Sequence, residues 1–249
     1  MALPTGNCLT GVRFLPIALV VAWFLAAVPA IAQPARSYDL VLVLAVDCSG
    51  SVNGGEYAMQ ISGIAAAFRD PEVIAAALGG PNGRISVNLM AWGDPDYPKF
   101  DSGWFDISTP EEAEIFAKAA DRFDYRTGGG TGLGIAVAYA IALIENRSFV
   151  TLRKVIDVSG DGIESYEIRQ PKFLLKDAHR LRVKSGIVIN GLAIMTDDPE
   201  LDSYYREHVA GGPGSFVMDI DDYRDFPESI KQKLLREIRP ATALLEQAP

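Results

Sequence analysis

Hydrophobic and polar positions alternate in blocks along the chain. The unbroken apolar run over 40–46 predicts a strand buried on both faces, as in the middle of a parallel sheet. Further strands are predicted over 84–92, 100–107, 153–158, 187–194 and 215–219. Helices are predicted between them, over 54–68, 109–123, 133–144, 171–184, 200–209 and 227–239.

This order of elements indicates the fold class. Because helices follow most strands, we predict one three-layer α/β/α domain, with a mostly parallel central sheet of about six strands and one antiparallel hairpin strand. The strands over 84–92 and 100–107 form the predicted hairpin. The helix over 133–144 is apolar on nearly every side, so we expect it to be buried; it is too short to cross a bilayer.

Residues 1–32 differ from the rest of the chain. Arg13 is their one charged residue, and an apolar run over 14–28 and then Ala30-Ile31-Ala32 follow it. A basic start, a short apolar segment and an A-x-A site predict a secretory signal peptide cleaved near Ala32. The domain over 33–249 is then periplasmic or secreted, with no predicted membrane span. A retained anchor is the alternative, although two prolines interrupt the segment.

Charge and cysteine content narrow the class of partner. The chain has 32 acidic and 23 basic residues, and its leader contains no acid. This balance argues against nucleic acid or an anionic membrane surface as the main partner, and it suits a divalent cation or a basic protein surface. Cys48 is the one cysteine outside the leader, which excludes an internal disulfide and a cysteine-based zinc site.

Polar side chains collect in three loops at the ends of predicted elements. Asp47-x-Ser49-x-Ser51 follows the first strand, Thr131 ends the glycine run over 128–130, and Asp161 follows the strand over 153–158. Ligands of open α/β sheets bind beyond the carboxyl ends of the strands, so we expect these loops to meet at one edge. Two carboxylates and three hydroxyls form a set of oxygen donors that favours Mg²⁺, Mn²⁺ or Ca²⁺ over Zn²⁺.

The three loops together resemble the metal-ion-dependent adhesion site of von Willebrand factor A (vWA) domains. The resemblance covers about residues 38–240 and implies that Asp47, Ser49, Ser51, Thr131 and Asp161 hold the metal ion. Gly160 departs from the pattern, because vWA domains often have Thr-Asp-Gly at the third loop. With the leader, the chain is similar to a bacterial family of secreted vWA-like proteins without an assigned function.

The resemblance also implies a function. In vWA domains the metal ion keeps an open position that accepts an Asp or Glu side chain from a partner protein. We therefore expect a non-catalytic binding domain that engages an acidic side chain through one divalent ion. Because the chain itself is acidic, it can bind an acidic side chain only if a cation lies between the two.

Other interpretations are left open by the sequence. The glycine run over 128–134 is also similar to the phosphate-binding loop of tubulin-like GTPases. An exported metal-dependent hydrolase is a second alternative, with His179 and His208 as the available imidazole bases and neither tied by spacing to a serine. A structural vWA subunit with a vestigial metal site is the third.

Four further acids belong near the same loops. Asp94 and Asp96 follow the strand over 84–92, and Glu56 and Glu164 lie close to the first and third loops. They can form a second cation site or set the preference for a partner. A solvated turn is the simpler explanation for them.

Overall fold

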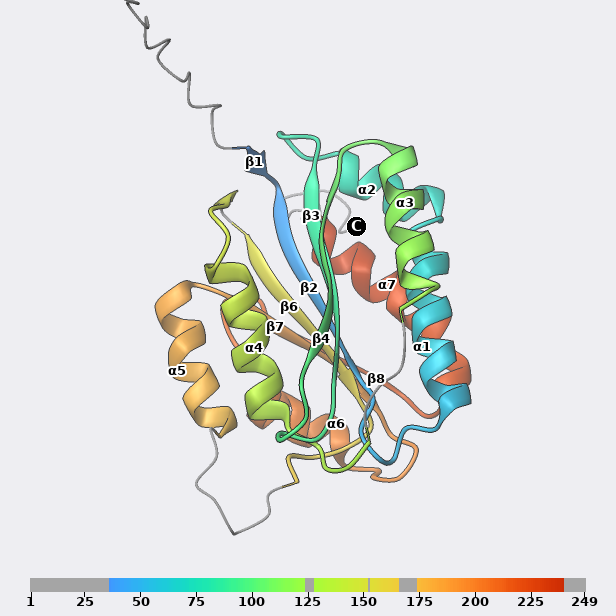
Figure 1. The fold of residues 1–249 in the computed structure, drawn as a ribbon, viewed down its shortest axis with the longest axis vertical. Helices are drawn as coiled ribbons and strands as arrows, with labels where there is room; N and C mark the ends of the chain where they lie inside the picture. The colour runs from blue at the N-terminus through green and yellow to red at the C-terminus, as the bar shows by residue number, and fades with distance from the viewer. Residues whose placement is uncertain (1–35, 124–127, 152, 166–173, 240–249) are drawn as a thin grey trace, which may run out of the picture. The chain divides into compact units, whose positions relative to one another are not determined.

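Strand β2 (Leu40–Asp47) lies in the middle of a six-stranded sheet with the order β4-β3-β2-β6-β7-β8 (Figure 1). The computed structural model describes residues 36–123, 128–151, 153–165 and 174–239. β3 and β4 pair antiparallel, and the other pairs in this sheet are parallel, which confirms the predicted fold class. The remaining strands of the sheet are β3 (Ile85–Trp92), β4 (Phe100–Ile107), β6 (Lys154–Gly160), β7 (Val188–Ile194) and β8 (Val217–Ile220).

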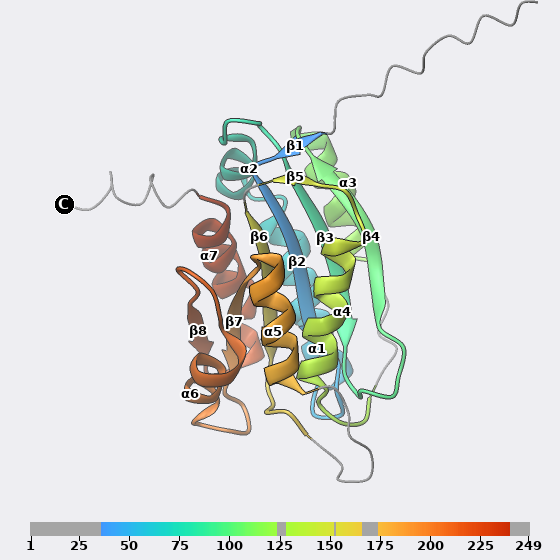
Figure 2. The same cartoon turned by 90° about the vertical axis from the view of Figure 1, so that its left-hand side faces the viewer.

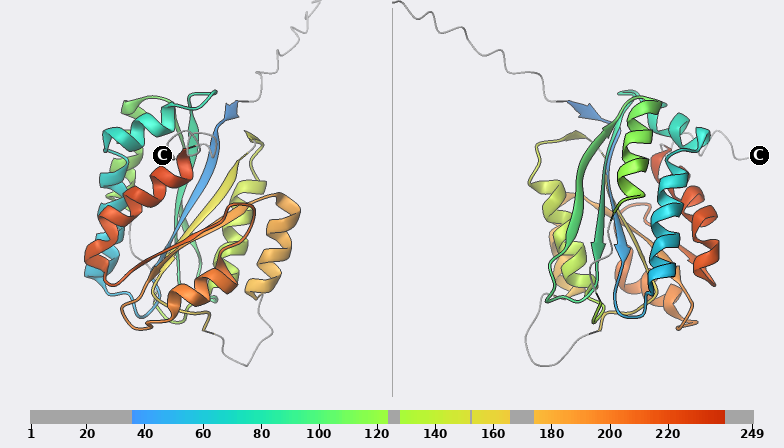
Figure 3. Two further views of the ribbon diagram at one scale, coloured as in Figure 1. Left: turned by 180° about the vertical axis from the view of Figure 1, so that it is seen from behind. Right: turned by 45° about the vertical axis from the view of Figure 1, so that its right-hand side comes forward.

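Each face of the sheet is covered by its own set of helices. Side chains alternate along a strand, so the even-numbered residues of β2 from Leu40 point to one face of the sheet, and the odd-numbered ones from Val41 point to the other. These two sides of the sheet are called the even face and the odd face. Figure 2 shows α4 and α5 side by side on the odd face, and Figure 3 shows α7 and α1 on the even face. The helices are α1 (Gly54–Ala67), α2 (Pro71–Leu78), α3 (Pro110–Ala120), α4 (Leu133–Glu145), α5 (Leu175–Ser185), α6 (Leu201–Tyr204) and α7 (Phe226–Ile238).

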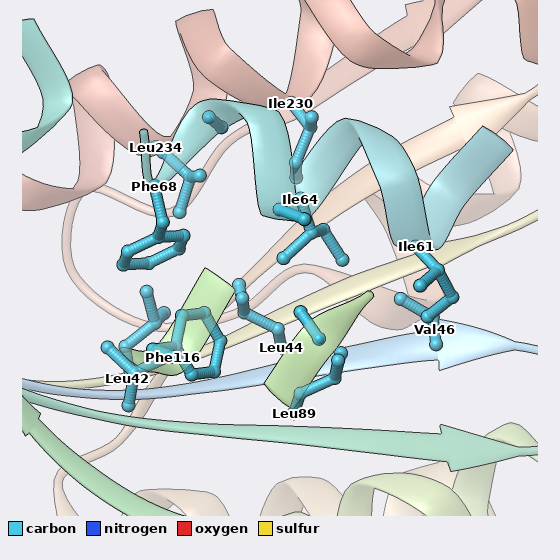
Figure 4. Close-up of a cluster of buried hydrophobic side chains, with 14 of the residues drawn as sticks. Leu42, Leu44, Val46, Ile61, Ile64, Phe68, Leu89, Phe116, Ile230 and Leu234 are labelled. Carbon is cyan, nitrogen blue, oxygen red and sulfur yellow. The ribbon is translucent and has the colours of Figure 1, made fainter. Parts of the chain in front are cut away.

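The larger core lies between β2 and helix α1. Ile61, Ile64 and Phe68 follow one another at helical spacing and point toward the sheet (Figure 4). Ile230 and Leu234 of α7 close the cluster from the outside. Burying a side chain of this size contributes about 1.5–3 kcal/mol, so this contact fixes α1, and with it the loop that leaves β2.

Side-chain caps begin helices α1 and α3. The Asn53 side chain accepts hydrogen bonds from Gly55 N–H and Glu56 N–H, and Glu56 in turn accepts from Asn53 N–H. Thr109 Oγ1 accepts from Glu112 N–H at the start of α3, with proline in the first turn. These caps satisfy backbone N–H groups that have no partner inside the helix.

Some elements differ from the prediction. α2 was not expected, because eight mostly apolar residues are too few to show helical periodicity. The helix predicted to end at 209 divides into α6 and a π-helix, η1 (Tyr205–Val209). β1 (Ser37–Tyr38) pairs with β5 (Val150–Thr151) in a small second sheet. Of the helix predicted over 171–184, residues 171–173 lie outside the described residues.

A buried ionic cluster joins α7 to the sheet on the even face. The Lys233 ammonium lies 2.6 Å from an Asp157 carboxylate oxygen and 2.8 Å from Glu237 Oε1, which also accepts from Asn190 Nδ2. All four side chains are buried. Burial and the neighbouring Asp157 raise the pKa of Glu237 to about 8. Two carboxyls share one ammonium, so the cluster is neutral only when one carboxyl keeps its proton.

Replacing Glu237 with glutamine is expected to flatten the dependence of stability on pH. The folded chain keeps this proton up to about pH 8, whereas the ordinary pKa is 4.5. The contribution of Glu237 is therefore fully present below pH 4.5 and decreases as the pH rises to about 8. Urea unfolding of both proteins across this range measures the effect. If the free energy of unfolding changes with pH equally in the variant and the parent chain, the prediction is wrong.

The described residues contain no helix that is long and apolar enough to cross a membrane. The predicted signal peptide over 1–32 lies outside the described residues, and so does the tail over 240–249. Export and cleavage near Ala32 therefore stay predictions.

Candidate metal centre

The three polar loops meet because β2 and β6 are neighbours. The two strands pair in parallel from Val41↔Lys154 to Val46↔Ser159, so Asp47 and Asp161 leave the same edge of the sheet side by side. The chain continues from β2 toward β3 and from β6 toward β7, in opposite directions across the sheet. This is a topological switch point, where α/β sheets form their binding crevices.

Hydrogen bonds connect four of the five predicted site residues. Asp47 Oδ1 accepts from Ser49 N–H at 2.7 Å, which holds the first loop in a tight turn. The Ser51 hydroxyl donates to Asp161 Oδ1 at 2.7 Å and lies 3.3 Å from the Ser49 hydroxyl. Asp47 and Ser49 are buried, whereas Ser51 is exposed at the rim. The structure thus brings the first and third loops together as predicted.

Thr131 reaches the same place from the second loop. A Cβ at Gly162, the residue after Asp161, would lie 3.1 Å from the Thr131 hydroxyl oxygen. The Thr131 backbone is tied to the third loop, since its N–H donates to Ser165 Oγ and its carbonyl accepts from Ser165 N–H. The threonine hydroxyl therefore lies against the segment that carries Asp161.

The glycine run is explained by close packing between loops. Gly129 has a φ of +76°, and a Cβ there would lie 2.5 Å from Asp94 Oδ2. Gly129 O accepts from Gly50 N–H at 2.9 Å, and Asp94 Oδ2 accepts from Gly130 N–H at 2.9 Å. The backbone of the second loop thus packs closely between the first loop and the turn after β3, which leaves no room for a side chain at Gly129. Asp94, predicted at the rim, holds this loop in place.

A carboxylate also lies at the start of α4. Glu164 Oε2 accepts from Gly134 N–H at 2.6 Å, and burial raises the pKa of Glu164 to about 7. Together with Asp94, Glu164 engages backbone N–H groups that a phosphate would need in a glycine-rich loop. This arrangement argues against the nucleotide interpretation. Glu56 belongs to the cap of α1, and Asp94 Oδ1 accepts from Asp96 N–H in a surface turn.

The electrostatics of the two acids suit a cation. Burial and the nearby Asp161 raise the pKa of Asp47 to about 7. Burial also raises the pKa of Asp161, and hydrogen bonding by the Ser51 and Tyr223 hydroxyls offsets part of this rise. Asp47 Oδ2 has no hydrogen-bond partner among the described residues. A buried carboxylate oxygen of this kind is costly unless a proton or a cation satisfies it, so the residues fit a divalent ion.

The donor set lacks a cluster of strong metal ligands. Within the described ranges no group of three or more His, Cys, Asp and Glu side chains is placed to hold a metal. Two carboxylates and three hydroxyls remain, which are the hard oxygen donors that Mg²⁺ and Ca²⁺ accept.

Two tyrosines beside the acids were missed by sequence reasoning. Tyr205 of η1 and Tyr223 of a 3₁₀ turn (Tyr223–Asp225) are buried. Burial, and then the charges of Asp47 and Asp161, raise the pKa of both hydroxyls. Both tyrosines come from connections after β7 and β8, far from the predicted motif in sequence. Gly160 was the available signal, because its missing side chain leaves room for Tyr205.

The two histidines serve contacts between helices. His179 Nε2 lies 2.8 Å from the carbonyl oxygen of His208, and the His208 ring packs against Tyr204 at 4.8 Å. Among the described residues, the hydrogen bonds, ion pairs and ring contacts of the two histidines do not involve Asp47 or Asp161.

Several solved structures share this arrangement of strands and helices. A von Willebrand factor type A protein from Catenulispora acidiphila has a TM-score of 0.53 at 18% identity over 81% of this chain and 43% of its own. The pilus adhesin SpaC from Lactobacillus rhamnosus GG has a TM-score of 0.57 at 16% identity, covering 83% of this chain and 30% of its own. The fold is therefore that of a vWA domain.

A third structure is proximal thread matrix protein 1 from the mussel byssus, with a zinc-occupied metal-ion-dependent adhesion site. Its TM-score is 0.52 at 14% identity, and the match covers 81% of this chain and 48% of that protein. The chain spans less than half the length of each of these three structures. No curated protein matches it. By sequence, the chain belongs to the family described as protein of unknown function (DUF1194), whose model matches residues 37–242.

Proposed function

We propose that this chain binds a partner protein through one divalent ion held by Asp47, Ser49, Ser51, Thr131 and Asp161. The observation that carries the proposal is the convergence of three loops around Asp47, whose Oδ2 is buried and has no partner among the described residues. The similarity of the fold to a pilus adhesin and to a thread matrix protein supports a role in adhesion or binding.

The donor set suggests what the ion contributes. Three of the five donors are neutral hydroxyls, so a bound ion would keep positive charge that attracts an acidic group. Ser51 is exposed, which leaves the rim of the site open to a ligand. In an acidic chain this position is suited to a Glu or Asp side chain of a partner. Mg²⁺ is the expected ion, and Mn²⁺ or Ca²⁺ can replace it.

Export and the absence of catalysis belong to the same proposal. An extracellular or periplasmic location follows from the predicted signal peptide, and an adhesion role agrees with it. Because the described contacts of His179 and His208 are with other segments, the site has no imidazole base beside Asp47 or Asp161 among those residues. We therefore favour binding over metal-assisted hydrolysis.

Titration of the purified chain with Mg²⁺, Mn²⁺ and Ca²⁺ by calorimetry is expected to give one binding site. Capture of protein from the periplasm on the immobilised chain should then depend on the ion and disappear in EDTA. Capture that survives EDTA would contradict the metal bridge. A chain that binds no divalent ion would favour the alternative of a structural subunit with a vestigial metal site. Turnover of an ester or phosphate substrate by the loaded chain would favour the hydrolase.

A further inference from the structure

One tyrosine hydroxyl beside the candidate metal centre has no evident structural purpose. The Tyr205 side chain is fully buried, and its hydroxyl has no hydrogen-bond partner among the described residues. Asp47 Oδ2, also buried, has none either. A Cβ built on Gly160 would lie 2.8 Å from the tyrosine oxygen and 2.7 Å from Asp47 Oδ2. The two unsatisfied oxygens therefore flank one point, next to Asp161 in sequence.

Two strand glycines make the slot in which Tyr205 lies. A Cβ at Gly191 of β7 would be 2.8 Å from a ring carbon of Tyr205, and a Cβ at Gly160 of β6 would be 2.8 Å from its hydroxyl. Glycine inside a strand weakens it and marks close approach of another group. Here both glycines lie on the odd face of adjacent strands, so together they leave room for one tyrosine from η1 beside the end of β2.

The backbone at Tyr205 has an uncommon helical form. Tyr205 begins the π-helix η1, and its carbonyl accepts from Ala210 N–H at 2.8 Å. The preceding Tyr204 hydroxyl accepts from Glu164 N–H at 3.2 Å. Tyr204 thus contacts the third loop, and the hydroxyl of the next residue, Tyr205, lies beside Gly160 at the end of β6. Single π turns occur often at functional sites.

Packing alone does not explain the hydroxyl. Leaving a buried polar group unsatisfied is unfavourable, and phenylalanine would fill the same slot without that penalty. The threonine that vWA domains often carry before the third-loop aspartate is missing, and its space is taken by the two oxygens.

We propose that the Tyr205 hydroxyl is a positioning donor for Asp47, holding its Oδ2 while Ser49 N–H holds Oδ1, so that the carboxylate is oriented toward a bound divalent ion. This inference rests on the proposed metal centre. It adds a residue outside the three loops, and it makes η1 part of the site. Groups that orient metal ligands in this way typically change metal affinity 10- to 100-fold when removed.

Replacing Tyr205 with phenylalanine tests the proposal with Mn²⁺ as the probe. The variant is expected to bind Mn²⁺ about 10- to 100-fold more weakly in calorimetry. Without metal it should melt in EDTA at the same temperature as the parent chain or higher, because an unsatisfied hydroxyl is gone. Metal should also change the ultraviolet absorbance of tyrosine more in the parent chain than in the variant, which keeps Tyr223 beside Asp161. Tyr97→Phe is the matched control, since Tyr97 is exposed.

A second variant keeps the test informative if the first folds poorly. Gly160→Ala places a methyl group between the two oxygens and is expected to weaken Mn²⁺ binding, whereas Gly54→Ala, with nothing within 4 Å, should not. In the double variant the two losses should be less than additive, because both act on one contact. Equal Mn²⁺ affinity of Tyr205→Phe and the parent chain would overturn this proposal alone. A parent chain that does not bind Mn²⁺ would overturn the metal centre with it.

Discussion

Replacing Lys233 with methionine is expected to lower the free energy of unfolding at neutral pH by about 3–5 kcal/mol. The ammonium lies within 2.6 Å of Asp157 and 2.8 Å of Glu237, and all three side chains are at most 2% exposed. Without it, two carboxyls remain in the core with no opposite charge beside them. Urea unfolding with tryptophan fluorescence measures the loss.

Lys231→Met provides the matched control for this prediction. Lys231 lies on the same helix and pairs with Asp70 at 2.9 Å, but near the surface. Removing a pair of that kind costs about 0–1 kcal/mol. Adding Glu237→Gln to Lys233→Met should recover part of the loss, because the two changes act on one cluster. Equal losses from the two lysine variants would show that the buried cluster is not specially important.

Replacing Asp47 with asparagine is expected to abolish stabilisation by divalent metal. If the ion binds as proposed, the parent chain gains about 2.7 kcal/mol at a metal concentration of 100 times Kd. Asparagine preserves the size of the side chain and an acceptor for Ser49 N–H, but it removes the charge. In EDTA the variant should be no less stable, because burial already raises the pKa of Asp47 to about 7. Melting scans with and without Mg²⁺ measure both effects.

Asp197→Asn is the control for Asp47→Asn. Asp197 is exposed, and its charge acts on Asp161, so it lies at the same edge of the sheet without belonging to the five proposed ligands. This variant should keep its response to Mg²⁺. A parent chain whose melting temperature is unchanged by Mg²⁺, Mn²⁺ and Ca²⁺ would contradict the prediction and favour a vestigial site.

The fold could be predicted because its strongest signals are local. The apolar run over 40–46 is buried on both faces as expected, and Thr109 with Pro110 begins a helix as their sequence indicates. α2 and the π-helix η1 could not be predicted in the same way. α2 is short and mostly apolar, and η1 depends on how Tyr205 fits against Gly191 in three dimensions.

In the candidate site too, local spacing could be predicted from the sequence, whereas contacts between distant segments could not. Asp47, Ser49 and Ser51 have the spacing of one turn, so their meeting with Asp161 required only that β2 and β6 be neighbours. The use of Asp94 and Glu164 to hold the second loop and α4 was not visible in the sequence, because both contacts cross between loops. Tyr205 was invisible for the same reason, and whether the site binds metal stays a prediction.

The direction of β2 has a mechanical consequence if the chain binds a partner as proposed. The described chain enters through β1 at the end of the sheet where β2 begins, and Asp47 lies about 23 Å from Leu40, at the other end of the strand. A pull between a metal-bound partner and the amino terminus would therefore run lengthwise along β2. That strand is held over its length by β3 and over 41–46 by β6, so its hydrogen bonds would be loaded together in shear, instead of opening one after another.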